Sequence, residues 1–366
     1  MNEAVAAFDL DGADHLLDLT ADLVDVPSES FSEAALVERI GATLRDFEHL
    51  EVTRVGDNLV ARTSLGRPNR VVLAGHTDTV PANGNGSARL EGDRLWGVGS
   101  ADMKGGLAVM LALAAECTTP PVDLSFVFYA REEVAARHSG LEELLSSRPE
   151  LLEGDVAVLG EPTLGQIEAG CQGSIRLRVT LRGRRAHTAR AWMGSNAIHR
   201  LGALLVAIAS EEPRRPEIRG CHFHEALQVV SVNGGVAGNV VPDEVTFEVV
   251  HRFAPDHSSE DAEAFLRGVL EPFIQGEDAI EVVDVAPAAM PAVDHPFIAG
   301  MIDRDGLGVE AKLGWTDVAR FAGIGVPAVN LGPGDPLLAH TAQEHVERSS
   351  ILGSYRVLRD AIDAGW

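Results

Sequence analysis

The chain has 366 residues, enough for about two domains of ordinary size, and its formal net charge is −25. Such an acidic protein is not expected to bind nucleic acid or an anionic membrane surface, because both partners require a basic face. Its apolar runs are too short to span a bilayer, its N-terminus lacks a signal-peptide pattern, and its three cysteines are too few for a disulfide framework. We therefore expect a cytoplasmic globular protein with no membrane or nucleic-acid partner.

Apolar patterning predicts alternating helices and strands in the first and last parts of the chain. Helical spacing of leucines predicts a helix over 13–26, and the apolar run 105–116 is typical of a buried helix. Continuous apolar runs predict buried strands at 70–75, 122–130, 155–160 and 327–332. This alternation predicts an α/β fold with a mostly parallel sheet and helices on both faces.

The middle of the chain has a different pattern. Residues 174–182 alternate strictly between apolar and polar side chains, as in a half-exposed strand. The expected elements are a strand at 174–182, a helix at 195–210, strands at 227–232 and 244–253, a helix at 258–274 and a strand at 279–285. The order predicts an inserted ferredoxin-like split βαβ domain. We therefore expect a catalytic domain of residues 1–171 and 287–366, and an inserted lid or dimerisation domain of residues 172–286.

Histidine and carboxylate side chains follow the predicted buried strands, where ligands bind in open α/β sheets. The residues at these strand ends, or just before the buried helix, are His76, Asp78, Asp102, Glu132, Glu133, Glu161 and His340. Each alone is better explained by a surface turn, a solvated charge or a helix cap, but their coincidence at strand ends favours a metal site. Imidazole and carboxylate donors without thiolates suit zinc, cobalt or manganese.

Five motifs then carry a resemblance. GHTDTV, GVGSADMKGG, YAREEV, LGEPT and GPGDPLLAHTAQE are similar, in order and spacing, to the motifs of the two-zinc aminoacylase/carboxypeptidase family of amidohydrolases. Within that family, GCQGSI, HRFAPD and GWTDVARF resemble the succinyl-diaminopimelate desuccinylases of actinobacterial type. The resemblance extends over nearly the whole chain.

The resemblance implies roles for these residues. It implies two zinc ions, with cobalt as a substitute, and five protein ligands: His76 and Glu161 on one ion, Glu133 and His340 on the other, and Asp102 on both. Asp78 would orient the ring of His76, and Glu132 would be the general base. His187, reaching over from the inserted domain of a second subunit, would stabilise the oxyanion.

The implied reaction is release of succinate from N-succinyl-LL-2,6-diaminopimelate, a step of lysine and diaminopimelate biosynthesis. The alternative is acetylornithine deacetylase or another N-acyl-amino-acid hydrolase or carboxypeptidase of the same family. A catalytically inactive binding protein is disfavoured, because a binding module needs no general base such as Glu132.

The substrate is thus a small N-acyl amino acid, and three residues are expected to contact it. Arg252 ends a predicted strand and is expected to pair with a substrate carboxylate, and Asn239 and Ser174 are the other two. One departure from the desuccinylases concerns anion binding, since some of them carry arginine where this chain has Cys171-Gln172. Different groups are therefore expected to bind the substrate anion here.

A homodimer is expected through the inserted domain. The strand at 174–182 belongs to a small sheet whose edges must be covered or paired in a soluble protein. Pairing with the same element of a second copy would cover them, and a two-fold axis is the commonest arrangement. His187 would then serve the active site of the partner.

Overall fold

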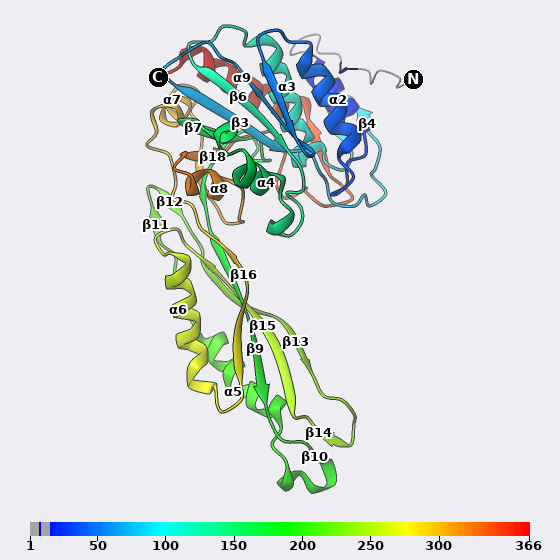
Figure 1. The fold of residues 1–366 in the computed structure, drawn as a ribbon, viewed down its shortest axis with the longest axis vertical. Helices are drawn as coiled ribbons and strands as arrows, with labels where there is room; N and C mark the ends of the chain where they lie inside the picture. The colour runs from blue at the N-terminus through cyan, green and yellow to red at the C-terminus, as the bar shows by residue number, and fades with distance from the viewer. Residues whose placement is uncertain (1–6, 9–14) are drawn as a thin grey trace. The chain divides into compact units, whose positions relative to one another are not determined.

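The computed structural model describes residues 7–8 and 15–366, and contacts divide it into two compact units (Figure 1). Unit 1 comprises Met1–Ala169, Ala292–Glu310 and Arg320–Trp366, and unit 2 comprises Gly170–Pro291 and Ala311–Ala319. The first two residues of the helix expected at 13–26 lie outside the described residues.

Unit 2 is larger than the inserted domain expected from the sequence. The expected domain covered residues 172–286, whereas unit 2 continues to residue 291 and also includes residues 311–319. The difference has a local cause. The backbone N–H of Gln172 donates to the carbonyl of Lys312, and the Trp315 indole donates to the carbonyl of Pro287. Cys171 also forms an isolated bridge with Ala289. These bonds attach 287–291 and 311–319 to unit 2, and no periodic pattern in the sequence announces them.

Unit 1 contains most of the predicted alternation. Its elements up to the insertion are α1 (Leu16–Val24), α2 (Ala34–Arg45), β1 (Glu51–Val55), β2 (Asn58–Arg62), β3 (Arg70–His76), β4 (Arg89–Glu91), β5 (Arg94–Trp96), η2 (Ser100–Lys104), α3 (Gly105–Glu116), β6 (Asp123–Tyr129), η3 (Ala136–His138), α4 (Gly140–Ser147), η4 (Pro149–Leu152), β7 (Val156–Leu159) and β8 (Ile167–Cys171). After the insertion come α7 (Pro296–Asp305), β17 (Val309–Lys312), α8 (Val318–Gly323), β18 (Ala328–Asn330), β19 (His345–Glu347) and α9 (Arg348–Ala364).

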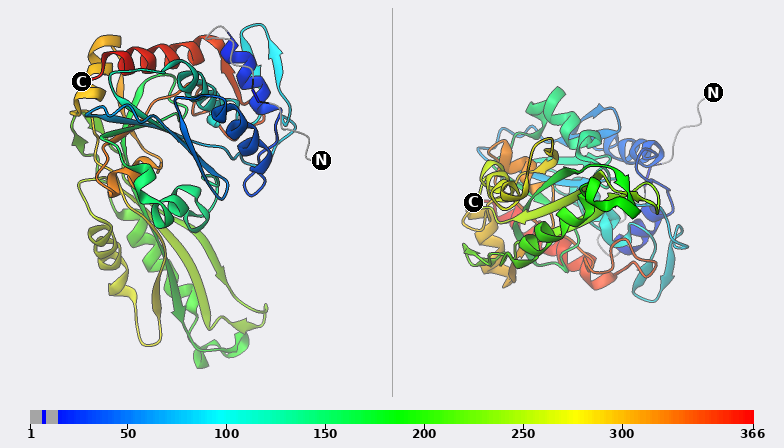
Figure 2. Two further views of the ribbon diagram at one scale, coloured as in Figure 1. Left: turned by 45° about the horizontal axis from the view of Figure 1, so that its top comes forward. Right: turned by 90° about the horizontal axis from the view of Figure 1, so that it is seen from below.

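The central sheet has eight strands in the order β1-β2-β6-β3-β7-β18-β8-β17. Its four middle strands are the four that the sequence predicted, and they run parallel. Helices α3 and α9 cover one face of the sheet and α4 lies against the other (Figure 2). The predicted α/β fold with a mostly parallel sheet is therefore confirmed.

Helix α3 spans the residues that the sequence predicted, 105–116, and its first ten residues are buried. Its backbone lies close to the end of β7. A Cβ atom added at Gly106 would lie only 2.2 Å from the carbonyl oxygen of Gly160. Glycine is thus required where helix and strand backbones approach. This contact places the segment preceding α3, which carries Asp102, beside the strand ends.

Unit 2 has the predicted βαββαβ order. Its elements are β9 (Gly173–Arg182), β10 (Ala186–His187), η5 (Thr188–Met193), α5 (Ala197–Ser210), β11 (Glu217–Ile218), β12 (Cys221–His222), β13 (Ala226–Gly234), β14 (Val240–Val241), β15 (Glu244–Phe253), α6 (Ser259–Leu270), η6 (Glu271–Phe273) and β16 (Ala279–Ala286). The main sheet is antiparallel, in the order β13-β15-β9-β16, which is the ferredoxin-like arrangement.

Strand β9 has one buried and one exposed face, as predicted. Its apolar side chains pack in one cluster with residues of α5 and α6, for example Leu204 and Leu266. Its other face carries arginines that pair with β15, such as Arg178 with Glu248 at 2.7 Å. Because β9 pairs on both sides, it cannot pair with a second copy, and β13 and β16 form the edges of this sheet.

No helix among the described residues combines the length and apolar character needed to cross a membrane.

Candidate metal centre and active site

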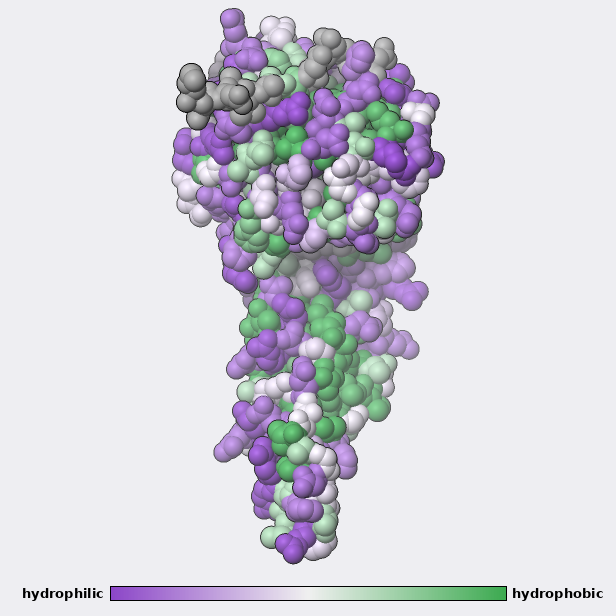
Figure 3. Space-filling view, turned by 90° about the vertical axis from the view of Figure 1, so that its right-hand side faces the viewer, coloured by the Kyte–Doolittle hydropathy of each residue, from purple (hydrophilic) through white to green (hydrophobic). Residues whose placement is uncertain are grey.

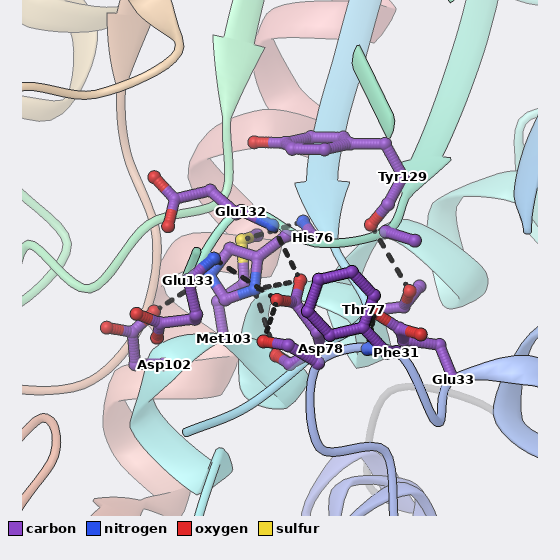
Figure 4. A network of polar contacts seen from close by, with 12 residues as sticks. Phe31, Glu33, His76, Thr77, Asp78, Asp102, Met103, Tyr129, Glu132 and Glu133 are labelled. Atoms are coloured by element: carbon purple, nitrogen blue, oxygen red, sulfur yellow. Dashed lines mark hydrogen bonds and ion pairs between the residues drawn. The ribbon is translucent and has the colours of Figure 1, made fainter. Parts of the chain in front are cut away.

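The ends of the parallel strands bring three of the predicted side chains together. His76 is the last residue of β3, Glu133 follows β6, and Asp102 lies in η2 just before α3. One ligand atom of each lies within 4.8 Å of those of the other two (Figure 4). His340, from the segment after β18, joins them, since its Nε2 lies 2.7 Å from Oε1 of Glu133.

The two oxygens of Asp102 face two different histidines. Oδ1 lies 3.0 Å from Nε2 of His76, and Oδ2 lies 3.5 Å from Nε2 of His340. A carboxylate with one oxygen toward each of two imidazoles has the arrangement needed to bridge two cations. The Asp102–Met103 peptide bond is cis.

The pKa values follow from this geometry. Burial lowers the pKa of His76, but contacts with Asp102 and Asp78 and the nearby charge of Glu161 outweigh it, so the net pKa is well above the usual value. Contacts with Asp102 and Glu133 raise the pKa of His340 to about 10. In the absence of a metal, a proton on each imidazole stabilises its contact with the neighbouring carboxylates. A divalent cation held between the same nitrogen and oxygen atoms would have the same effect, so the donor set fits a metal centre.

Glu161 follows β7 and only 6% of its surface is exposed. Its charge is among the causes that raise the pKa of His76. The five segments that the sequence singled out thus lie at the same edge of the sheet, where the side chains of His76, Asp102, Glu133 and His340 meet.

Asp78 interacts with more than His76. The Nδ1 atom of His76 lies 3.0 Å from the backbone oxygen of Asp78 and 3.6 Å from its carboxylate. The same carboxylate accepts the backbone N–H of Glu132 at 2.9 Å and that of Glu133 at 3.1 Å. Ser30 donates to it as well, at 2.7 Å. Asp78 therefore fixes the turn that carries Glu132 and Glu133, in addition to contacting the histidine.

Glu344 is a site residue whose role was not predicted from the sequence. It is 1% exposed, and its Oε1 accepts the backbone N–H groups of Ala101 and Asp102, both at 3.1 Å. Burial raises its pKa to about 7. The sequence feature that could have indicated Glu344 is its position four residues after His340 in the motif AHTAQE. A motif does not, however, show which backbone groups a side chain will contact.

A model of peptidase family M20/M25/M40 matches residues 72–364. The chain belongs to this family. Two relatives match it over nearly their whole length. A Mycobacterium tuberculosis protein provisionally named succinyl-diaminopimelate desuccinylase DapE is 47% identical over 94% of this chain and 96% of its own. A Corynebacterium glutamicum succinyl-diaminopimelate desuccinylase is 41% identical over 93% of this chain and 94% of its own.

Solved structures agree on the M20 fold. Aminopeptidase PepT of Bacillus cereus has a TM-score of 0.79 at 20% identity, covering 97% of this chain and 99% of its own. The YXEP protein of Bacillus subtilis, described as a dinuclear metal-binding peptidase of the M20 family, has a TM-score of 0.70 at 16% identity, covering 96% and 97%.

The remaining predicted residues of this M20 chain lie in unit 2, in two pairs. His187 lies in β10 opposite Val240 of β14, and the N–H of the next residue donates to the carbonyl of Asn239. Ser174 and Arg252 face each other in register near the other end of β9 and β15. The eight residue-to-residue steps from Ser174 to Arg182 at the end of β9 span roughly 26 Å. The two pairs are therefore well separated within the unit.

Proposed function

We propose that this chain is a two-metal amide hydrolase that releases succinate from N-succinyl-LL-2,6-diaminopimelate. The observation that carries the metal-dependent hydrolysis is Asp102, whose two oxygens face His76 and His340. The substrate rests on the names of the relatives that are 47% and 41% identical.

The donor set suggests which residues would hold the metals. His76 and Glu161 would bind one zinc ion, Glu133 and His340 the other, and Asp102 both, with cobalt as a substitute. Three carboxylates carry −3 against +4 for two divalent cations, so the loaded centre would keep a net charge of only +1. When bound, the metals lower the pKa of a water molecule and polarise the amide carbonyl.

Glu132 is proposed to move the proton. It adjoins Glu133 but is not one of the proposed metal ligands, and its carboxylate would take a proton from water and return it to the leaving amine. Asp78 holds the backbone of Glu132 in place through a 2.9 Å hydrogen bond. An ordered base of this kind needs no large movement between its two proton transfers.

Unit 2 is proposed to supply the substrate contacts. Arg252 would pair bidentately with a substrate carboxylate, with Ser174 beside it in register. His187 and Asn239 would act at the carbonyl being attacked. Since the two pairs lie far apart within one unit 2, we propose that His187 and Asn239 act in the site of a second subunit.

The surface of unit 2 supports a homodimer. Val206 on the outward face of α5 is 67% exposed, and Val230 and Val232 on the edge strand β13 are 56% and 50% exposed. Figure 3 shows apolar side chains gathered on this flank of unit 2. Pairing of two β13 strands, with their α5 helices side by side, would bury these residues and remove a sheet edge. The pairing strand is therefore proposed to be β13 and not the strand expected at 174–182, because that strand (β9) lies inside the sheet.

The test is an amide-hydrolysis assay with added zinc that compares N-succinyl-LL-2,6-diaminopimelate with N-acetylornithine. We expect kcat/KM to favour the succinyl substrate by at least about 100-fold, because a site that pairs with a substrate carboxylate disfavours an analogue that leaves its groups unpaired. A preference for N-acetylornithine would refute the proposed substrate but would still support amide hydrolase activity. As a biosynthetic enzyme of this kind, the protein is proposed to act in the cytoplasm.

A further inference from the structure

Arg131 immediately precedes the proposed base, Glu132, and the proposed reaction assigns it no role. Its backbone is left-handed, with a φ of +61°, a conformation that residues other than glycine rarely adopt. Backbone strain of this kind persists only where the surrounding structure imposes it, and it is concentrated at functional sites. Five residues other than glycine have a positive φ in the described part of the chain, and one of the others is His340, a proposed metal ligand. The conformation of Arg131 therefore needs a cause outside its own sequence position.

The side chain of Arg131 supplies that cause. Its Nε donates to the carbonyl oxygen of His138 at 2.8 Å, and its Nη2 donates to Oε2 of Glu143 at 2.9 Å. Its Nη1 lies 3.6 Å from Oδ2 of Asp57, and the side chain is only 17% exposed. Because three nitrogens of a planar guanidinium face protein oxygens, the group is fixed in one position. It joins the chain before Glu132 to helix α4 and to the turn between β1 and β2.

Glu143 is itself held in place by a buried amide. Its Oε2 also accepts a hydrogen bond from Nδ2 of Asn58 at 3.1 Å, and Asn58 is fully buried. Oδ1 of Asn58 accepts the backbone N–H of Ala130 at 3.0 Å. A Cβ atom added at Gly140 would lie 1.9 Å from the same Oδ1, so glycine is required where α4 begins. The Glu143 carboxylate and the Asn58 amide thus bind the two residues that precede Glu132.

The turn that carries Glu132 is therefore held on both of its sides. Asp78 accepts the N–H groups of Glu132 and Glu133, and the anchors at Asn58 and Glu143 hold the two residues before them. A group that takes part in proton transfer must be kept within about 0.5 Å of its working position by the residues around it. The bonds to Asp78 alone leave the chain before the turn free to rotate, and the second set of bonds prevents this.

We infer that Arg131 is a positioning residue for the proposed base and that Glu143 is its anchor. The guanidinium, bound to Glu143, keeps the backbone of residue 131 left-handed and so sets the direction in which the turn leaves β6. The effect on catalysis rests on the proposed function, whereas the effect on the turn does not.

The first test measures the turn itself, by hydrogen–deuterium exchange and mass spectrometry of the full-length protein without added metal. Arg131→Ala should speed exchange in the peptide that contains the N–H groups of Glu132 and Glu133 by at least about tenfold, because their bonds to Asp78 then open more often. Arg219→Ala is the matched control, since Arg219 is also left-handed and also donates to a backbone carbonyl, but in unit 2. It should leave that peptide unchanged. Unchanged exchange in Arg131→Ala would refute the inference, whatever the substrate of the enzyme.

The second test separates the side chain of residue 131 from its backbone. Glycine adopts a positive φ without strain, so Arg131→Gly permits the conformation but removes the guanidinium. We expect kcat to fall by at least about 30-fold in both Arg131→Ala and Arg131→Gly, because the base is displaced. KM should stay within about threefold of wild type, because Arg131 does not bind the substrate. Wild-type kcat in Arg131→Gly would show that the side chain is not needed and would overturn the inference.

The third test uses the anchor, which is a milder change if Arg131→Ala does not fold. Glu143→Gln keeps an acceptor oxygen for Arg131 and Asn58, whereas Glu143→Ala removes it. We expect kcat to fall about tenfold in the alanine variant and to stay within about threefold of wild type in the glutamine variant. Glu142→Ala is the control on the same helix, because Glu142 is exposed and pairs with Arg320. Equal kcat in the two Glu143 variants would show that Glu143 is not the anchor.

Discussion

The backbone N–H of Glu132 donates a 2.9 Å hydrogen bond to the carboxylate of Asp78, and the other oxygen of that carboxylate accepts the N–H of Glu133. One buried side chain thus orients both the proposed base and a proposed metal ligand. In Figure 4 this carboxylate lies between the turn of Glu132 and Glu133 and the side chain of His76.

Asp78→Ala should therefore reduce kcat/KM by about 100-fold or more, because a displacement of about 1 Å at a catalytic group has effects of that size. Metal content, measured by elemental analysis, should also fall, since Glu133 loses its backbone anchor. Ser30→Ala removes only one hydrogen bond to the same carboxylate and should cost less than about tenfold. An Asp78→Ala enzyme within a few-fold of wild type would refute this role.

Glu132→Gln should lower kcat by at least about 100-fold while metal content and circular dichroism stay unchanged. Glutamine keeps the shape of the side chain and its backbone bond to Asp78, but it cannot accept the proton. Glu48→Gln, an exposed glutamate elsewhere in unit 1, is the control. If kcat of Glu132→Gln remained close to wild type, another group would have to be the base.

Glu344→Ala and Glu344→Gln should behave differently. Alanine removes the acceptor that holds the N–H groups of Ala101 and Asp102, so the bridging carboxylate of Asp102 loses its fixed position. Glutamine keeps an acceptor oxygen at that point. We expect the alanine variant to lose activity and to change the visible absorption spectrum of the cobalt-substituted enzyme, and the glutamine variant to restore most of both. A merely structural role would leave the spectrum unchanged.

Chelation should abolish activity but leave the fold intact. The proposed ligands lie at the ends of strands whose apolar side chains are already buried, unlike the ligands of a zinc finger. Circular dichroism at 25 °C should not change, while the melting temperature should fall because a ligand of the native state has been removed. Loss of the helical signal on chelation would contradict this expectation.

Mixing two inactive variants should restore activity if His187 serves the partner's site. His187→Ala and Glu132→Gln each disable every site of their own homodimer. A mixed dimer contains one site with both changes and one site with neither, so subunit exchange should recover up to about one quarter of wild-type activity at random mixing.

The control for this mixing experiment is exchange followed by mass spectrometry of differently labelled chains. Proven exchange without recovery would mean that His187 does not act across the dimer. Val232→Arg places a charge on the proposed β13 edge and should shift the protein to monomers, which light scattering would detect.

The sequence by itself determined the alternation of strands and helices, the ferredoxin-like order of unit 2, and the set of side chains at the strand ends. These features are local: the run 105–116 is apolar on all sides, and 174–182 alternates, whatever the rest of the chain does. Motifs at the ends of buried parallel strands must meet at one edge, so the site could also be located in advance.

Only the tertiary structure decided how those side chains are held. The hydrogen bond from Glu132 to Asp78 joins residues 54 apart, and that from Asp102 to Glu344 joins residues 242 apart. The interior position of β9 and the attachment of 311–319 to unit 2 likewise depend on pairing between distant segments. Periodicity reports which face of an element is buried, but the partner of a buried polar group is set by packing between elements that no local pattern records.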